Sequence, residues 1–134
     1  MIKKIYGNSS VELRNLLDNS FNLCITSPPY KNADGYSPAL MHSVFTQLYR
    51  VLDAGSLFFL NFGHLANDKF RPFATCKIAM DVGFKLNDTI VWSKNHYTPL
   101  QGNRRLNNLT EFIFLLYKRK WITLLYAMAS CQPY

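Results

Sequence analysis

The decisive stretch of the sequence runs from Phe21 to Tyr30 and reads Phe-Asn-Leu-Cys-Ile-Thr-Ser-Pro-Pro-Tyr. Its first six residues form a mainly apolar run that is typical of a strand, and Pro28 and Pro29 close that run abruptly. Two consecutive prolines remove two backbone donors and fix two φ angles, and Ser27 before them is held in an extended conformation. The pattern therefore predicts a strand over 21–26 that leads into a rigid loop, whose carbonyls and side chains point outward.

Outward from this strand, the chain alternates between strand and helix patterns. Further strands are predicted over residues 2–6, 56–62, 84–93 and 111–118. A first helix over 9–17 is expected because Ser9 and Glu12 have capping-box spacing. A second helix begins after the cap Ser37 and ends before Gly55, and a third ends at Val82.

This alternation predicts the α/β class, with a three-layer Rossmann-like sheet and helices on both faces. The strand over 56–62 is strongly apolar, which indicates a central position in the sheet. Right-handed crossovers would place a ligand site at the carboxyl ends of the strands, where the Pro-Pro loop lies.

The composition excludes several classes of protein. The chain has 134 residues, 49% of them hydrophobic, which suits one domain with a real core and argues against intrinsic disorder. No apolar run approaches the roughly 18 residues of a membrane span, and the N-terminus lacks a signal-peptide pattern, so we expect a cytoplasmic protein. Three scattered cysteines and three scattered histidines predict neither a disulfide framework nor a metal site.

The positive charge of the chain is concentrated in residues 94–120. This stretch holds six basic residues and one acid, Glu111, and so carries +5 of the net charge of +7. Clustered cations favour binding to a polyanion such as DNA. A solvated basic face explains the same pattern equally well, and charge alone leaves both interpretations open.

The loop after the first strand has the chemistry to hold a planar amine. The Ser27 hydroxyl and a loop carbonyl can each accept a hydrogen bond from an NH2 group. Tyr30 offers a flat face on which a base can stack. Taken alone, a Pro-Pro-Tyr loop favours the structural interpretation, a stiff proline turn with a packed tyrosine.

Ser27-Pro28-Pro29-Tyr30 resembles the catalytic loop of the amino-methyltransferases that act on DNA. The surrounding segments are similar to that family in order and spacing at residues 5–9, 49–57, 83–94 and 104–114. The resemblance covers about residues 2 to 120. Serine at the first motif position most resembles the cytosine-N4 enzymes, with the adenine-N6 enzymes as the alternative.

This resemblance implies S-adenosylmethionine as the methyl donor and a flipped DNA base as the acceptor. It implies catalytic roles for the four loop residues Ser27, Pro28, Pro29 and Tyr30. The donor would be bordered by Asn8, Thr26 and Ser27, although the family commonly carries Asp where this chain has Asn8. Apart from the resemblance, the basic residues Lys94, Arg104 and Arg105 are candidate contacts to the DNA backbone, and Lys94 could equally do no more than end its strand.

The resemblance also implies that part of the family's domain is not in this sequence. No two glycines are close enough to form a Gly-x-Gly cofactor loop. We therefore expect the catalytic-loop-first half of a permuted enzyme in residues 1–120, followed by a tail over 121–134 of unclear structure. The unpaired sheet edge that results would favour self-association or pairing with a complementing second half.

Besides adenine-N6 activity, two functional alternatives remain open at this stage. The chain could be a non-catalytic nucleic-acid-binding remnant of the same fold, which would bind DNA through its basic stretch. RNA or protein could be the substrate, because the loop chemistry serves any planar amine or amide. Two further residues are undecided: Tyr36 could close over a base or pack in its loop, and His64 could border the pocket or lie on the surface.

Overall fold

The structure is a computed structural model that describes residues 4–30, 35–65, 68–95 and 109–119. The described elements follow one another as α1 (Ser9–Glu12), the 3-10 turn η1 (Leu13–Asn15), β1 (Phe21–Thr26), α2 (Pro38–Val51), β2 (Leu52–Gly63), α3 (Arg71–Val82), β3 (Lys85–Ser93) and β4 (Thr110–Tyr117).

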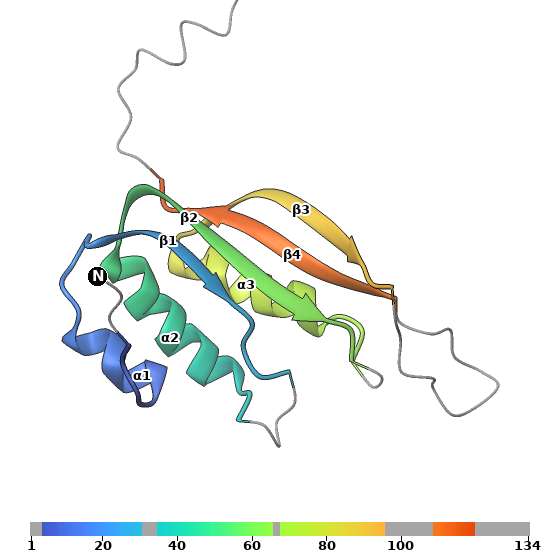
Figure 1. Cartoon of the computed structure of the whole chain (residues 1–134), viewed down its shortest axis with the longest axis horizontal. Coiled ribbons are helices and arrows are strands. Elements are labelled where there is room, and N and C mark those ends of the chain that lie inside the picture. Colours follow the sequence, from blue (N-terminus) through green and yellow to red (C-terminus); the bar gives the residue numbers. More distant parts are fainter. Residues whose placement is uncertain (1–3, 31–34, 66–67, 96–108, 120–134) are drawn as a thin grey trace, which may run out of the picture.

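The four strands form one mixed sheet in the order β1-β2-β4-β3 (Figure 1). β1 and β2 are parallel, with Thr26 opposite Leu60, whereas β4 runs antiparallel to both of its neighbours. β2 lies between β1 and β4, which confirms the central position predicted from its apolar sequence. The carboxyl ends of β1 and β2 therefore meet at one edge of the sheet.

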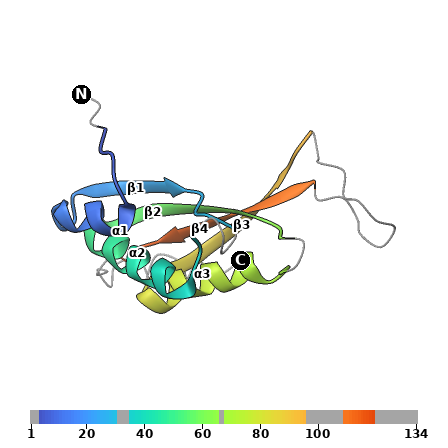
Figure 2. The same cartoon turned by 90° about the horizontal axis from the view of Figure 1, so that it is seen from below.

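The helices α2 and α3 pack on the same face of the sheet (Figure 2). This inner face carries alternate residues of β2 and β4, and their side chains are fully buried against the helices. Aromatic rings dominate the contact: Phe58 lies edge-on to Phe45 and is tilted against Phe84, with centroids 5.6 and 5.0 Å apart. This aromatic layer is the core of the chain.

The opposite face of the sheet, here called the outer face, is much more exposed. Leu23 and Ile25 of β1 and Leu57 of β2 are 52%, 70% and 41% exposed. In the part of the chain that the structure describes, every helix lies on the inner side, so the second helical layer of a three-layer fold is not among these residues (Figure 2).

Strong local signals predicted most elements closely. β1 has the predicted bounds, and α2 begins as predicted, with the Ser37 hydroxyl accepting from the Leu40 amide at 3.1 Å and Pro38 in the first turn. The helix before Gly83 and the two later strands are also confirmed within one or two residues. None of the described helices is long and apolar enough to cross a membrane.

Two predictions at the N-terminus were wrong. The described residues 4–6 are exposed and form no strand, because they pair with none of the described strands. The cap of α1 is Asn8 and not Ser9, since the Asn8 Oδ1 accepts from the Ser10 amide at 3.0 Å. The α-helix ends at Glu12 and tightens into η1, so the helical segment is shorter than predicted.

Candidate active site

The Ser27–Tyr30 loop lies at the carboxyl end of β1, where the sequence places it. The Ser27 hydroxyl and the Tyr30 hydroxyl are hydrogen-bonded at 3.0 Å. The Tyr30 ring stacks on Phe62 at the end of β2, with centroids 4.5 Å apart and planes 23° apart. Because Phe62 is fully buried, the loop rests on a fixed part of the core.

Arg71, at the first turn of α3, anchors the loop from the other side. Its guanidinium donates to the Tyr30 carbonyl at 3.1 Å and lies 4.7 Å above the Tyr36 ring. The Tyr36 hydroxyl is hydrogen-bonded to Thr75 at 3.1 Å, and both side chains are buried. Of the two interpretations of Tyr36, the structure therefore supports the packed tyrosine. Arg71 was not singled out in the sequence, where it carries no distinguishing signal.

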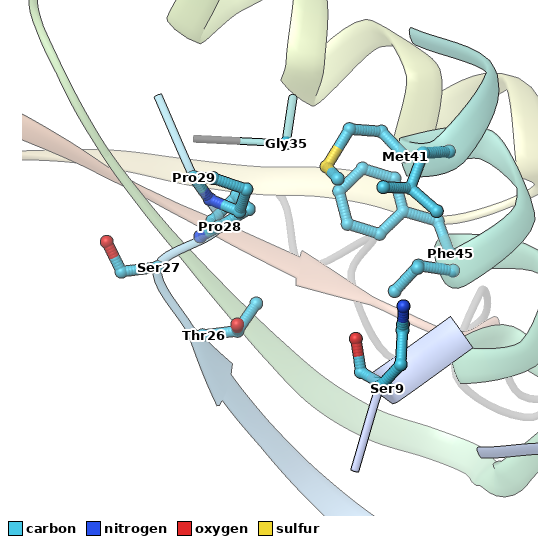
Figure 3. Close-up of a pocket in the computed structure, with 11 residues that line it drawn as sticks. Ser9, Thr26, Ser27, Pro28, Pro29, Gly35, Met41 and Phe45 are labelled. Atoms are coloured by element: carbon cyan, nitrogen blue, oxygen red, sulfur yellow. The ribbon is translucent and has the colours of Figure 1, made fainter. Parts of the chain in front are cut away.

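A pocket of about 390 Å³ opens beside the loop (Figure 3). Its polar wall is formed by Asn8, Ser9, Thr26 and Ser27, and its apolar wall by the prolines of the loop and by Leu40, Met41, Val44 and Phe45 of α2. Met41 and Phe45 project toward Pro28 and Pro29, whereas the Ser27 hydroxyl points away from them (Figure 3). The pocket thus brings together the three residues that the resemblance assigned to a cofactor: Asn8, Thr26 and Ser27.

Comparison with known proteins identifies the family. The family model described as DNA methylase matches residues 21–130, which is most of the chain. The chain belongs to the DNA methylase family. Among curated proteins it is 32% identical to the type II beta methyltransferase M.BslI of Bacillus sp. (strain NEB-606), over 80% of this chain and 14% of the relative. It is 29% identical to the orphan methyltransferase M.BamHII of Bacillus amyloliquefaciens, over 79% of this chain and 42% of the relative.

Solved structures agree on the fold. A DNA modification methylase from Thermus thermophilus, solved with S-adenosyl-L-methionine, superimposes with a TM-score of 0.67 at 20% identity. That match covers 95% of this chain and 61% of the other. The cytosine-N4-specific PvuII DNA methyltransferase gives a TM-score of 0.65 at 19% identity, over 95% and 53% of the two chains. The chain spans less than half the length of the curated relatives it matches.

Asn8 of this methylase chain already has a structural role. Its Oδ1 accepts from both the amide and the hydroxyl of Ser10, at 3.0 and 2.8 Å, and so caps α1. Its carbonyl accepts from the amides of Val11 and Glu12. The side chain that borders the pocket is therefore held in place by the helix that follows it.

A polar cluster on the outer face adjoins the loop. Glu111, at the start of β4, forms an ion pair with Lys94 and accepts from the Asn61 Nδ2 at 3.0 Å. Burial acts to raise the pKa of the Glu111 carboxyl, but hydrogen bonds from Lys94, Asn61 and Tyr30 and the charge of Lys94 outweigh it. The pKa of Glu111 consequently lies below its ordinary value, and the carboxylate is ionised at neutral pH.

Glu111 and Asn61 were not predicted as site residues. Two signals pointed to Glu111: it is the single acid in the basic stretch 94–120, and it lies in the segment 104–114 that resembles the family. Lys94 was predicted as a DNA contact, and its ammonium group is engaged by Glu111 in this structure. Arg104, Arg105 and the predicted tail over 121–134 lie outside the described residues.

His64 follows β2 directly and is half-buried. Its ring is edge-on to Phe112 with centroids 4.8 Å apart, and its Nδ1 is buried without a hydrogen-bond partner among the described residues. Burial lowers the pKa of His64, and the charges of Lys69 and Lys94 lower it further. The imidazole is therefore neutral at pH 7.

Proposed function

We propose that this chain forms the base-binding half of a DNA methyltransferase that methylates the exocyclic N4 amine of cytosine with S-adenosylmethionine as donor. The observation that carries the proposal is the position of the Ser27–Tyr30 loop: it ends a parallel strand, is anchored on Phe62 and Arg71, and borders a pocket. Ligands in open α/β sheets bind at this end of the strands. The whole enzyme would carry its catalytic loop before its cofactor glycine loop.

In this proposal Ser27 and a loop carbonyl hold the target amine. The lone pair of the amine is delocalised into the base, and hydrogen bonds accepted from both of its N–H groups favour a pyramidal, nucleophilic nitrogen. Such a nitrogen would take the methyl group directly, with the carbon–sulfur bond of the sulfonium broken and one amine proton released, so no covalent enzyme intermediate is needed. Pro28 and Pro29 keep the acceptors rigid, and Tyr30 supplies a face for the base that has left the duplex.

The pocket fits a donor of the size and chemistry of S-adenosylmethionine. Its volume of about 390 Å³ falls in the usual range of roughly 300–1,000 Å³ for ligand pockets. Asn8, Thr26 and Ser27 offer polar groups, while Met41 and Phe45 offer an apolar wall. When bound, S-adenosylmethionine supplies the sulfonium methyl group.

We assign the binding of the DNA backbone to the basic stretch, residues 94–120. Lys94, Arg104 and Arg105 would neutralise phosphates, which predicts binding that weakens steeply with salt. Lys94 directly follows β3, and Glu111 beside it leaves the local charge balanced in the absence of DNA.

The test is methyl transfer from isotopically labelled donor to unmethylated genomic DNA, followed by mass spectrometry of the nucleosides. Ser27→Ala should lower transfer by at least about 100-fold, because an acceptor aimed at the reacting amine is removed. Ser20→Ala is the matched control, because Ser20 precedes the same strand and its hydroxyl donates to the Leu17 carbonyl. Salt-sensitive DNA binding without donor binding would instead support a non-catalytic module.

The methylated product decides the acceptor base. N4-methyldeoxycytidine supports the proposal, and N6-methyldeoxyadenosine would assign the chain to the adenine-specific branch. Transfer to RNA or protein, with none to DNA, would overturn the substrate class. If no methyl transfer is seen, calorimetric titration of the donor into the chain shows whether the donor site or the right substrate is missing.

We further infer that the free edge of β1 associates with another polypeptide, either a second copy or a complementing half of the domain. Among the described strands, β1 pairs only with β2, and its outer side chains Leu23 and Ile25 are exposed. An apolar open edge invites pairing. Light scattering at micromolar concentration should detect a dimer, and a monomer would count against self-association.

A further inference from the structure

A chain of polar contacts links the Ser27 hydroxyl to an ionised carboxylate. Ser27 contacts the Tyr30 hydroxyl at 3.0 Å. The Tyr30 ring lies beside the Glu111 carboxylate, because both approach the same side of Gly63, and Tyr30 is one of the groups that lower the pKa of Glu111. Glu111 is held from two other sides, by the Lys94 ammonium and by the Asn61 amide. The contacts join β1, β2, β3 and β4 at the same end of the sheet.

Gly63 makes this arrangement possible. It is paired with Glu111 across β2 and β4, and Tyr30 packs against its free face. A Cβ atom at position 63 would lie 2.9 Å from the Tyr30 Cε2 and 3.3 Å from the Glu111 Oε1. The absence of a side chain at Gly63 therefore lets the tyrosine and the carboxylate meet.

The carboxylate fixes the direction of the hydrogen bonds. An ionised carboxylate only accepts, so the hydroxyl proton of Tyr30 is attracted toward Glu111. The Tyr30 oxygen is then left to accept from Ser27, and the Ser27 proton is used in that bond. What remains on Ser27 for a substrate is a pair of acceptor sites.

We propose that Glu111 is a positioning residue that acts through Tyr30 to keep the Ser27 hydroxyl an acceptor toward the base. This inference rests on the proposed function and deepens it, because it adds a basis for selecting an amine. An exocyclic NH2 group meets an acceptor, whereas a keto oxygen at the same position meets lone pairs and is repelled. The site would in this way favour cytosine or adenine over thymine or uracil.

The first arm of the test does not require catalysis. The chain is labelled at the tyrosine Cζ, and the Tyr30 resonance is identified with Tyr30→Phe. Glu111→Gln should move the Tyr30 resonance, because the anionic acceptor of its hydroxyl is lost. Asp81→Asn is the matched control, since it also removes the acid of an ion pair, with Lys77 on α3, and should leave the resonance unchanged. An unchanged resonance in Glu111→Gln would overturn the proposal.

The second arm measures methyl transfer. Glu111→Gln should lower the turnover about 10- to 100-fold, the cost of a lost hydrogen bond to a charged group, while the donor dissociation constant stays within about twofold. Glu111→Asp should restore part of the rate, which a purely structural defect would not predict. Unchanged turnover in Glu111→Gln would overturn the proposal. If the wild-type chain transfers no methyl group, the proposed function fails, and the tyrosine resonance still decides whether the contact exists.

Discussion

The two faces of the sheet are built from the same strands but differ sharply in burial. On the inner face Phe58, Phe62 and Phe114 are at most 1% exposed, whereas on the outer face Leu23 and Ile25 are more than half exposed. The inner face is closed by α2 and α3, which this chain supplies itself. Fold stability thus comes mainly from one side of the sheet, while the outer face and the β1 edge remain available to other chain segments.

The largest effect is expected when two consecutive residues of β2, which point to opposite faces of the sheet, are each replaced by alanine and their losses of stability are compared. Phe58→Ala should lower the free energy of unfolding by about 3–5 kcal/mol, because a fully buried ring leaves a cavity between α2 and the sheet. Leu57→Ala should cost under about 1.5 kcal/mol, because its side chain is already 41% exposed. Urea unfolding followed by circular dichroism measures both.

Equal losses for the two variants would contradict the comparison. They would mean that the outer face is covered in solution as completely as the inner one. In that case the unfolding midpoint should also rise with protein concentration, because a partner that binds only the folded chain stabilises it by mass action.

A second prediction concerns Glu111, a half-buried charge of the outer face. Its folded pKa is depressed, so its contribution to stability is present above its unfolded pKa and is lost as the pH falls through the folded value. Glu111→Gln should cost about 1.5–3 kcal/mol at pH 7, because the hydrogen bonds involve a charged group. The difference from the wild type should shrink below about pH 4.5.

The exposed pair Lys77–Asp81 on α3 provides the contrast for that measurement. Asp81→Asn should change the free energy of unfolding by about 0.5 kcal/mol or less at every pH, since exposed ion pairs contribute little. A pH-independent difference between wild type and Glu111→Gln would show that the carboxyl titrates normally in the folded chain.

These residues also show what the sequence can predict. β1, the Ser37 cap and the Ser27–Tyr30 loop depend on neighbours within a few positions, so local pattern was enough. The contact between Tyr30 and Glu111 depends on the antiparallel register of β4 against β2, which no local pattern contains. Arg71 reaches the loop only because α3 packs beside it.

The two wrong predictions also failed because contacts outside the local pattern decided the structure. Residues 2–6 have a strand-like pattern, but strand formation needs a pairing partner, and the described residues 4–6 pair with none of the described strands. Ser9 and Glu12 have the spacing of a capping box, yet Asn8 reaches the free amide of Ser10 first. Tertiary context and competition between adjacent caps decided both cases.

A third prediction tests whether the outer face is open. Ile25→Lys should change the free energy of unfolding by no more than about 0.5 kcal/mol, because the side chain is 70% exposed. It should also reduce the binding of a hydrophobic fluorescent dye and weaken any self-association through β1, since a lysine on an edge strand opposes pairing. Strong destabilisation by Ile25→Lys, with dye binding unchanged, would show that this face is already covered.

The smallest expected effect is a difference in alkylation rate between two thiols, those of Cys24 and Cys76. Burial raises the pKa of both Cys24 and Cys76 to about 11, so alkylation at pH 8 should be about 100-fold slower than for a free cysteine. In low, non-denaturing urea the two should diverge. Cys24 lies on β1, which has one strand partner in the described sheet, whereas Cys76 is a buried residue of α3. Local opening of the edge strand should therefore expose Cys24 first, as read by mass spectrometry of alkylated peptides. Equal protection of the two thiols would mean that β1 opens only with the whole domain, and that its edge is held by a partner in solution.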